Sequence, residues 1–140
     1  MQFQLITLSG VKYSADAYAV TLPTASGVET ILPNHEPLMS VLIPGVITVR
    51  RNAKDPDSAL EHYATFGGVV QVIGDDVQVL VDEADNDEDI NIAEAEKARA
   101  HAQELLKNAS NQVELDHAQG MVDRQAVRLQ VAQLHRRNRR

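Results

Sequence analysis

Apolar and polar residues alternate in short runs over the first part of the chain. Residues 18–22, 46–50 and 77–81 place every second side chain on one face, which is the period of a half-buried strand. Gly, Pro, Asp and Asn separate the runs, and these residues favour turns. Helical segments do not alternate with the strands, so a β–α–β fold is not indicated. The pattern predicts an antiparallel β-sandwich over residues 1–86.

The pattern changes after Val81. Ala, Glu, Gln, Lys and Arg dominate, and these are good helix formers. Ala and Leu recur at spacings of three and four residues, which predicts amphipathic helices, and residues 108–111 interrupt them because Asn and Ser favour caps and turns. We therefore predict a mixed, two-part fold, in which the β-sandwich is followed by an α-helical hairpin over residues 87–140.

Composition limits the chemistry that the chain can carry. Hydrophobic residues make up 44% of the sequence but aromatic residues only 4%, so we expect a core of Val, Ile, Leu and Ala. There is no cysteine, which excludes disulfides and thiol nucleophiles. Neither a signal-like start nor a run of about 20 apolar residues is present. We expect a soluble protein that reaches a membrane only through a partner.

Catalytic and metal-binding motifs are absent from the sequence. It contains no phosphate-binding loop and no His-Glu-x-x-His, and Pro37 follows His35-Glu36, which rules out a helix there. We expect no enzyme activity, cofactor or metal. Two alternatives stay open: a nucleic-acid-binding module, although the few aromatic residues are not clustered into a stacking platform, and a small β-barrel metalloenzyme.

Residues 31–45 form the most unusual segment, which we call the proline segment. It holds three of the five prolines, and each proline fixes its own φ and restricts the residue before it. Apolar residues lie between the prolines. The composition predicts a stiff loop, which either plugs one end of the core or presents a preorganised patch to a partner.

Charge is distributed unevenly along the chain. The formal net charge is −7, and no Lys or Arg occurs between residues 55 and 96. The C-terminal region is rich in arginine: Arg124, Arg128, Arg136, Arg137, Arg139 and Arg140. Arg124 and Arg128 lie four residues apart, hence on one helical face. They are either solvated, paired with hairpin carboxylates such as Glu94, Glu96 or Glu104, or available to an acidic partner.

These features together resemble one family. The chain is similar to the epsilon subunits of F-type ATP synthases, which are called delta in mitochondria. The similarity rests on Leu32-Pro33-Asn34-His35-Glu36-Pro37-Leu38 with the later Pro44-Gly45, on the Gly67-Gly68 pair, on the acidic step into the first helix and on residues 128–132. The resemblance implies a ten-stranded sandwich with two C-terminal helices. It also implies a non-catalytic rotor subunit in the central stalk of a proton-translocating ATP synthase.

The resemblance further implies partners and sites. The gamma subunit would contact His35, Leu38, Met39 and Ser40, and the c ring would lie near Glu29, which stands one residue from the family's position. The helices would extend toward the alpha/beta catalytic head, where Arg124, Arg128, Arg136 and Arg137 would meet the beta subunits and inhibit ATP hydrolysis. Nucleic acid is not an expected partner. The expected location is the cytoplasmic face of the energy-coupling membrane, most simply a bacterial inner membrane, reached through the complex.

Two local departures from the family carry predictions. Some epsilon subunits bind ATP through Ile/Leu-Asp-x-x-Arg-Ala, but residues 90–95 here have Asn91 and Glu94 at the Asp and Arg positions. Arg124 and Arg128 match the family, yet the reversed charge at Glu94 would face phosphates. We predict that ATP binding is absent or millimolar. Asn34 replaces a common Gly, which predicts a positive φ.

Overall fold

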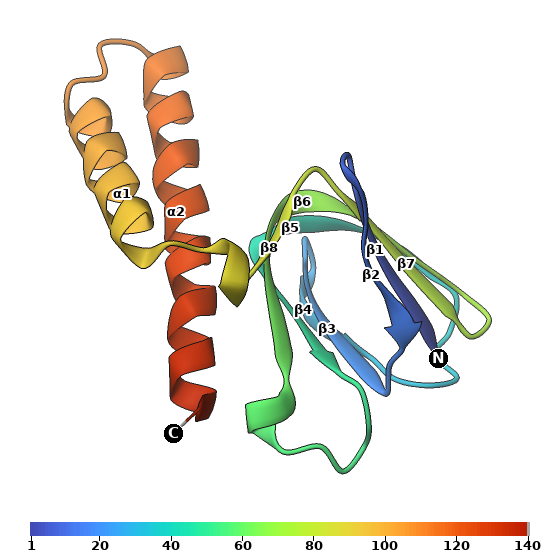
Figure 1. Ribbon diagram of the computed structural model, residues 1–140. Coiled ribbons are helices and arrows are strands. Elements are labelled where there is room, and N and C mark those ends of the chain that lie inside the picture. The colour runs from blue at the N-terminus through green and yellow to red at the C-terminus, as the bar shows by residue number, and fades with distance from the viewer. Residues whose placement is uncertain (140) are drawn as a thin grey trace.

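The computed structural model describes residues 1–139, and Arg140 lies outside them (Figure 1). The strands are β1 (Gln2–Thr7), β2 (Gly10–Asp16), β3 (Ala19–Thr24), β4 (Gly27–Ile31), β5 (Leu38–Arg50), β6 (Glu61–Ile73), β7 (Asp76–Val81) and β8 (Ala84–Asn86). The 3-10 turns η1 (Asp57–Ala59) and η2 (Asp87–Asp89) precede β6 and the helices, which are α1 (Ile92–Lys107) and α2 (Gln112–Arg139). The predicted order, a sandwich and then a helical hairpin, is confirmed.

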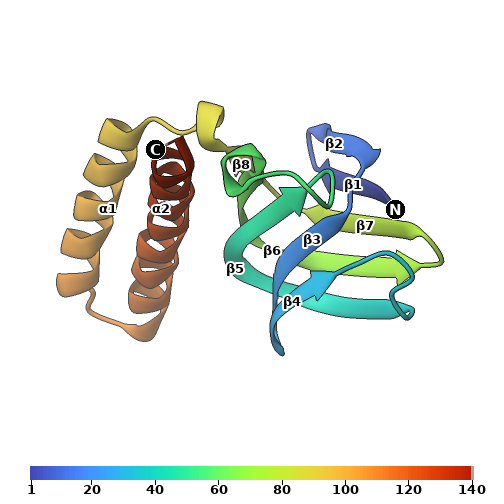
Figure 2. The same cartoon turned by 90° about the horizontal axis from the view of Figure 1, so that it is seen from below.

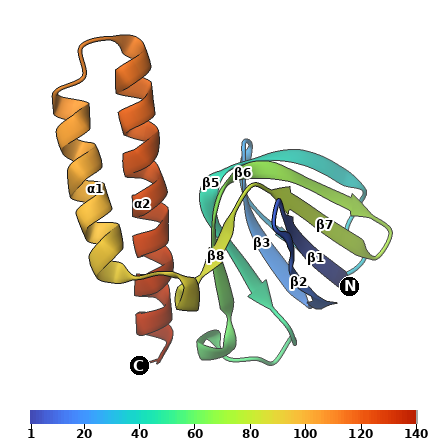
Figure 3. The same cartoon turned by 45° about the horizontal axis from the view of Figure 1, so that its top comes forward.

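One curved sheet builds the sandwich. Its strand order is β2-β1-β7-β6-β5-β3-β4, and β8 pairs with β6 off this path. The long strands β5 and β6 bend, so that β3 and β4 come to lie across from β1, β2 and β7 (Figure 3). Most pairs are antiparallel, but β1 runs parallel to β7. The sheet is therefore mixed, which differs from the fully antiparallel sandwich that we predicted.

Pro44-Gly45 and Gly67-Gly68 do not separate strands, although Gly and Pro separate the apolar runs of the sequence pattern. Pro44 pairs with Phe66 and Leu42 pairs with Gly68, so both strands continue through these positions. Gly67 and Gly68 have φ values of +106° and +151°, which bend β6 instead of ending it. Both pairs thus lie inside long strands. Residues 1–139 form eight strands, whereas the resemblance implied ten.

Alternation along the strands separates the core from the solvent. Val77, Val79 and Val81 of β7 are buried, whereas Gln78 and Leu80 are exposed. Aromatic side chains contribute more to the core than we expected. Their ring centroids lie 5.4 Å apart for Phe3 and Tyr13, and 6.3 Å apart for Tyr13 and Tyr63. The expectation that the aromatic residues do not cluster is therefore wrong, but the cluster is buried and offers no stacking platform.

Asparagine side chains define the limits of the helices. Asn91 accepts a hydrogen bond from the backbone N–H of Glu94 and so caps α1, and Asn111 accepts one from the N–H of Glu114 in the first turn of α2. The predicted break over residues 108–111 is confirmed. Ala95 and Ala102 of α1 are buried and allow close packing. In Figure 2 the helices lie side by side, with α2 next to the sandwich and α1 outside it.

Candidate docking surfaces

Only the first half of the proline segment is a loop. Residues 32–37 connect β4 to β5, and the chain is a strand from Leu38 onward. Asn34 has a φ of 65°, which confirms the predicted positive value. His35 is half-buried, and its Nδ1 lies 2.7 Å from the carbonyl oxygen of Glu36. The predicted stiff loop across the whole segment is thus wrong for residues 38–45, because they belong to β5 and pair with β6 between Thr65 and Val72, which extends the sheet.

Strand alternation separates the residues that we predicted to contact the gamma subunit. Leu38 packs against the core, and Ser40 is half-buried on the same inward side of β5. Met39 points the other way and is 74% exposed. His35 belongs to the preceding loop. The structure therefore places Met39, and not the whole set, on the outer face of the sheet.

Met39 lies at the end of one of two rows that cross the outer face. The register of β2, β1, β7, β6 and β5 aligns the first row, which we call the aliphatic row: Val11, Ile6, Leu80, Val69 and Val41. The next row, the glutamine row, consists of Ser14, Gln4, Gln78, Gln71 and Met39. With strands about 4.8 Å apart, each row is roughly 19 Å wide.

Most of the aliphatic row is exposed to solvent, including Val11, Leu80, Val69 and Val41. The Nε2 of Gln78 donates to the Oε1 of Gln4 at 3.2 Å, which orders part of the neighbouring row. Our sequence analysis missed this surface. The sequence did contain a sign of this surface. Strands β5, β6 and β7 carry apolar residues at both inward and outward positions, whereas a strand that is buried on one face needs them only at the inward positions. An exposed aliphatic stripe of this width indicates a contact site.

Glu29 lies on β4, the edge strand at the far end of the sheet from β2. The hydroxyl of Thr24 donates to its Oε1 at 3.3 Å, and the side chain is half-buried. The neighbouring Val28 is exposed. Glu29 is thus separated from the aliphatic row by β3, so the two features lie on different parts of the sandwich.

A strip on β6 receives α2. His62, Ala64 and Phe66 alternate with inward-facing residues and point away from the sandwich core. Ala64 packs with Val127 and Val131 of α2, and Phe66 lies at the margin of this contact. We call these three β6 residues the docking strip. It explains why consecutive residues of β6 are buried: alternate side chains face the core and the helix.

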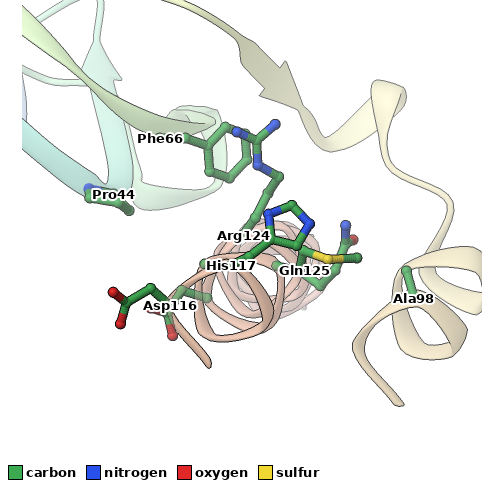
Figure 4. A pocket seen from close by; sticks show the side chains of 10 residues that line it. Pro44, Phe66, Ala98, Asp116, His117, Arg124 and Gln125 are labelled. Carbon is green, nitrogen blue, oxygen red and sulfur yellow. The ribbon is translucent and has the colours of Figure 1, made fainter. Parts of the chain in front are cut away.

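The arginine cluster lies at one end of the docking strip and consists of Phe66, Glu83, Asp85, Arg124 and Arg128. The guanidinium carbons of Arg124 and Arg128 lie 4.6 Å and 5.1 Å from the centre of the Phe66 ring. Arg124 and Arg128 contact the Oε2 of Glu83 at 3.1 Å and 3.2 Å, and Arg128 Nε donates to Asp85 at 2.8 Å. Figure 4 shows Arg124 beside the Phe66 ring.

These contacts correct the expected partners of the arginines. Neither a fully solvated face nor pairing with Glu94, Glu96 or Glu104 describes them, because the carboxylates come from the end of the sandwich. Our reasoning considered only hairpin partners, and the contacts span more than 40 residues of sequence. A cleft of about 650 Å³ beside the cluster is lined by Pro44 of the sandwich and His117, Met121 and Arg124 of α2, among others.

The histidine cluster lies at the other end of the strip and consists of Thr48, His62, Asp87, His135 and Asn138. His62 is only 8% exposed. Its Nδ1 lies 3.0 Å from the hydroxyl of Thr48, and its Nε2 lies 3.0 Å from the amide nitrogen of Asn138. His135 lies 3.2 Å from Asp87. Burial, and next the neighbouring His135, lower the pKa of His62.

The base of the hairpin is acidic where a phosphate would be expected in an ATP-binding relative. Asp85, Asp89 and Glu94 line a cavity of about 300 Å³, and Arg128 there is already paired with Asp85. Burial opposes ionisation of Asp89, but hydrogen bonds from Lys12 and the Asn86 backbone outweigh it and lower its pKa. Carboxylates therefore face this cavity, and weak or absent ATP binding stays a prediction.

The last predicted contacts, Arg136 and Arg137, are exposed near the end of α2. Arg140 belongs to the same predicted basic end but lies outside the described residues. Within residues 1–139, no helix has the length and apolar character that crossing a membrane requires.

Comparison with known proteins assigns the family. Residues 1–87 match the family model "ATP synthase, Delta/Epsilon chain, beta-sandwich domain", and residues 88–133 match "ATP synthase, Delta/Epsilon chain, long alpha-helix domain". The ATP synthase epsilon chain of Herpetosiphon aurantiacus is 34% identical over 139 residues, 99% of this chain and 98% of the relative. That of Moorella thermoacetica is 31% identical over 94% of this chain and 96% of the relative. The chain belongs to the ATP synthase delta/epsilon family.

Solved structures show the same fold. A chain of the Euglena gracilis mitochondrial ATP synthase, in an assembly of OSCP, F1 and c-ring, matches with a TM-score of 0.79 and 20% identity over 94% of this chain and 79% of its own. A chain from the Tetrahymena thermophila central stalk and c-ring matches with a TM-score of 0.67 and 15% identity, over 94% and 96%.

The family supplies the function class. Epsilon subunits are non-catalytic components of the central stalk of F-type ATP synthase, a proton-transporting membrane enzyme, and this confirms the class that the sequence predicted. The assignment replaces both alternatives, the nucleic-acid-binding module and the metalloenzyme.

Proposed function

We propose that the sandwich joins the gamma subunit to the c ring in the rotor, and that the α1–α2 hairpin restrains ATP hydrolysis in the alpha/beta head. The role is mechanical: the sandwich transmits torque, and chemistry takes place in other chains. The site of action is the cytoplasmic face of a bacterial energy-coupling membrane, reached through the complex. The bacterial relatives and the F-type central-stalk class support this proposal.

The exposed aliphatic row is the observation that carries the gamma contact. Fully burying one Val or Leu side chain stabilises a complex by roughly 1.5–3 kcal/mol, so several aligned across the strands provide a strong site. The glutamine row beside it offers directional hydrogen bonds, which oppose sliding under torque. Met39 is the β5 member of the glutamine row, and His35 lies in the loop that precedes β5. Glu29, on the edge strand β4, is the candidate contact for the c ring.

The arginine cluster supports a hairpin that can leave the sandwich. Ion pairs between partly exposed groups are worth at most about 1 kcal/mol each, so they are readily exchanged for other partners. Glu83 and Asp85 occupy Arg124 and Arg128 while the hairpin is docked. After release, these arginines, with Arg136 and Arg137, are available to acidic segments of the beta subunits. The same basic face thus serves both positions of the hairpin.

Substitution of Val41 tests the gamma contact. Val41→Lys places a charge in the aliphatic row at a side chain that is 58% exposed, so the isolated chain should remain folded. We expect its affinity for a gamma subunit to fall at least tenfold in a pull-down or calorimetric titration, because the ammonium group would be desolvated. Val113→Lys, at a 79% exposed valine in α2, is the matched control. Equal gamma binding by both variants would refute the proposed surface.

A further inference from the structure

We propose that His62 and Asn138 form a latch that holds the hairpin on the sandwich and opens when His62 gains a proton. The latch lies at the end of the docking strip away from the arginine cluster. It joins β6 to the last turns of α2 through a buried side chain. The inference concerns docking within this chain, so it stands whether or not the hairpin inhibits ATP hydrolysis.

The hydrogen bonds of His62 require the neutral ring. A neutral imidazole has one donor and one acceptor, and a protonated one has two donors. The amide N–H of Asn138 donates to Nε2, which leaves Nδ1 to carry the hydrogen and donate to the hydroxyl of Thr48. A proton on Nε2 would direct an N–H group at the Asn138 amide nitrogen. The hydrogen bond that joins strand and helix would then be lost.

On the side of His62 that faces α2 and η2, no charged group of residues 1–139 pairs with a protonated His62. On α2, His135 faces it, and Asp87 of η2 lies 3.2 Å from the Nε2 of His135 and not within ion-pair distance of His62. Glu88 of η2 is exposed at the rim of the same cavity of about 320 Å³. A positive charge on His62 would lie beside His135 in a partly desolvated site, and the two rings would repel each other if both were charged.

The sandwich side does not supply a free carboxylate either. Glu61 of β6 lies 2.6 Å from the guanidinium of Arg51 and accepts a hydrogen bond from Tyr63. On η1, which packs against α2, Asp57 pairs with Arg50 at 2.8 Å. Protonated His62 would keep its hydrogen bond to Thr48, but its Nε2–H group would face the Asn138 amide nitrogen and the buried cation would have no paired carboxylate among the described residues, and this state is costly.

The direction of the pH effect follows from proton linkage. Docking favours neutral His62, so the docked state binds fewer protons than the undocked state. Docking is therefore strongest above the ordinary histidine pKa of about 6.5 and weakens as the pH falls below it. Between about pH 8 and about pH 5 the docking constant should fall up to roughly 30-fold.

Energy transfer between two dyes can measure docking in the full chain. The sequence has no cysteine, so Lys54→Cys in the sandwich and Lys107→Cys in the hairpin label single sites. We expect transfer to change between about pH 8 and about pH 5, with the far-UV circular dichroism unchanged. The change should vanish in His62→Gln and persist both in His135→Gln and in the matched control His101→Gln, which alters an exposed histidine of α1.

Three results would overturn the latch: no pH response in the labelled chain, a response in His62→Gln equal to that of the parent, or loss of the response in His135→Gln alone. An NMR titration of the unsubstituted chain provides a test that does not depend on the variants. The ring signal of His62 should titrate with the same midpoint as the energy transfer. A different midpoint would refute the proposal even if His62→Gln failed to dock.

Discussion

Gly68 shows how one residue shapes the sandwich. Its φ of +151° lies in a region that other residues rarely adopt, and a Cβ atom there would lie 2.1 Å from the carbonyl oxygen of Leu80. The β6 backbone can therefore approach β7 closely only because a side chain is absent. The bend directs the two halves of β6 to different parts of the molecule, one to the aliphatic row and the other to the docking strip.

We predict that Gly68→Ala lowers the free energy of unfolding by roughly 3 kcal/mol or more, since it combines an unfavourable φ with a backbone clash. Denaturant unfolding followed by circular dichroism measures this. Gly120→Ala is the control, because Gly120 lies in α2 and a Cβ atom added there would have no neighbouring atom within 4 Å. This change should instead stabilise the chain by up to about 1 kcal/mol. Similar losses in both variants would contradict this role of Gly68.

Local chemistry made several residues predictable from sequence. Asn34 was expected at a positive φ, and the Asn-rich break between the helices was found, because these preferences depend on near neighbours. The pairing of Arg128 with Asp85 was not predictable in this way. Those residues come together only after the hairpin folds back on the sandwich.

At the scale of elements, α2 is held by a narrow contact. Ala64 and the valines Val127 and Val131 provide its buried apolar part, and polar clusters lie at both ends. Such an interface combines a small hydrophobic contribution with exchangeable ion pairs. The element can therefore be released by changes in charge without unfolding the sandwich core.

We predict that the double variant Glu83→Gln/Asp85→Asn loosens α2. Loss of the carboxylates that pair with Arg124 and Arg128 should weaken docking about fivefold or more, as expected for about 1 kcal/mol of partly exposed ion pairing. Amide hydrogen exchange around Val127 and Val131 should become faster by that factor. Asp82→Asn, which alters an exposed neighbouring carboxylate, should leave exchange unchanged. Unaltered exchange in the double variant would show that the cluster does not hold the hairpin.

Strand alternation was read correctly where one face is buried, as in β7, but it could not reveal the aliphatic row. That row depends on the register between strands distant in sequence, such as the parallel pairing of β1 with β7. The same limit explains why the residues around Pro44-Gly45 are strand and not the loop that we predicted. A proline and a glycine signal a turn locally, whereas the partner strand keeps the segment extended.

At the scale of the whole molecule, the two parts have separate means of stability. The sandwich has its own core, which extends from Phe3 to Ala84 and includes no helical residue. The link to the helices is closed by Asn86 and Asp89, which cap each other, and by the contact of Lys12 with Asp89. A chain that ends after Asp89 retains all of these contacts. One truncation therefore tests the two proposed roles, rotor assembly and restraint of hydrolysis, separately.

We predict that removing residues 90–140 leaves a folded sandwich that still binds the gamma subunit, and that a reconstituted ATP synthase with this fragment hydrolyses ATP faster than one with the full chain. The reason is that the fragment keeps the aliphatic row but lacks every helix that could reach the catalytic head. Hydrolysis rates at equal occupancy of the complex provide the measurement, and the truncated Val41→Lys variant, which should fail to assemble, is the control. If the fragment assembles and the rate does not rise, the hairpin does not inhibit hydrolysis in this enzyme, whereas the coupling role of the sandwich is unaffected.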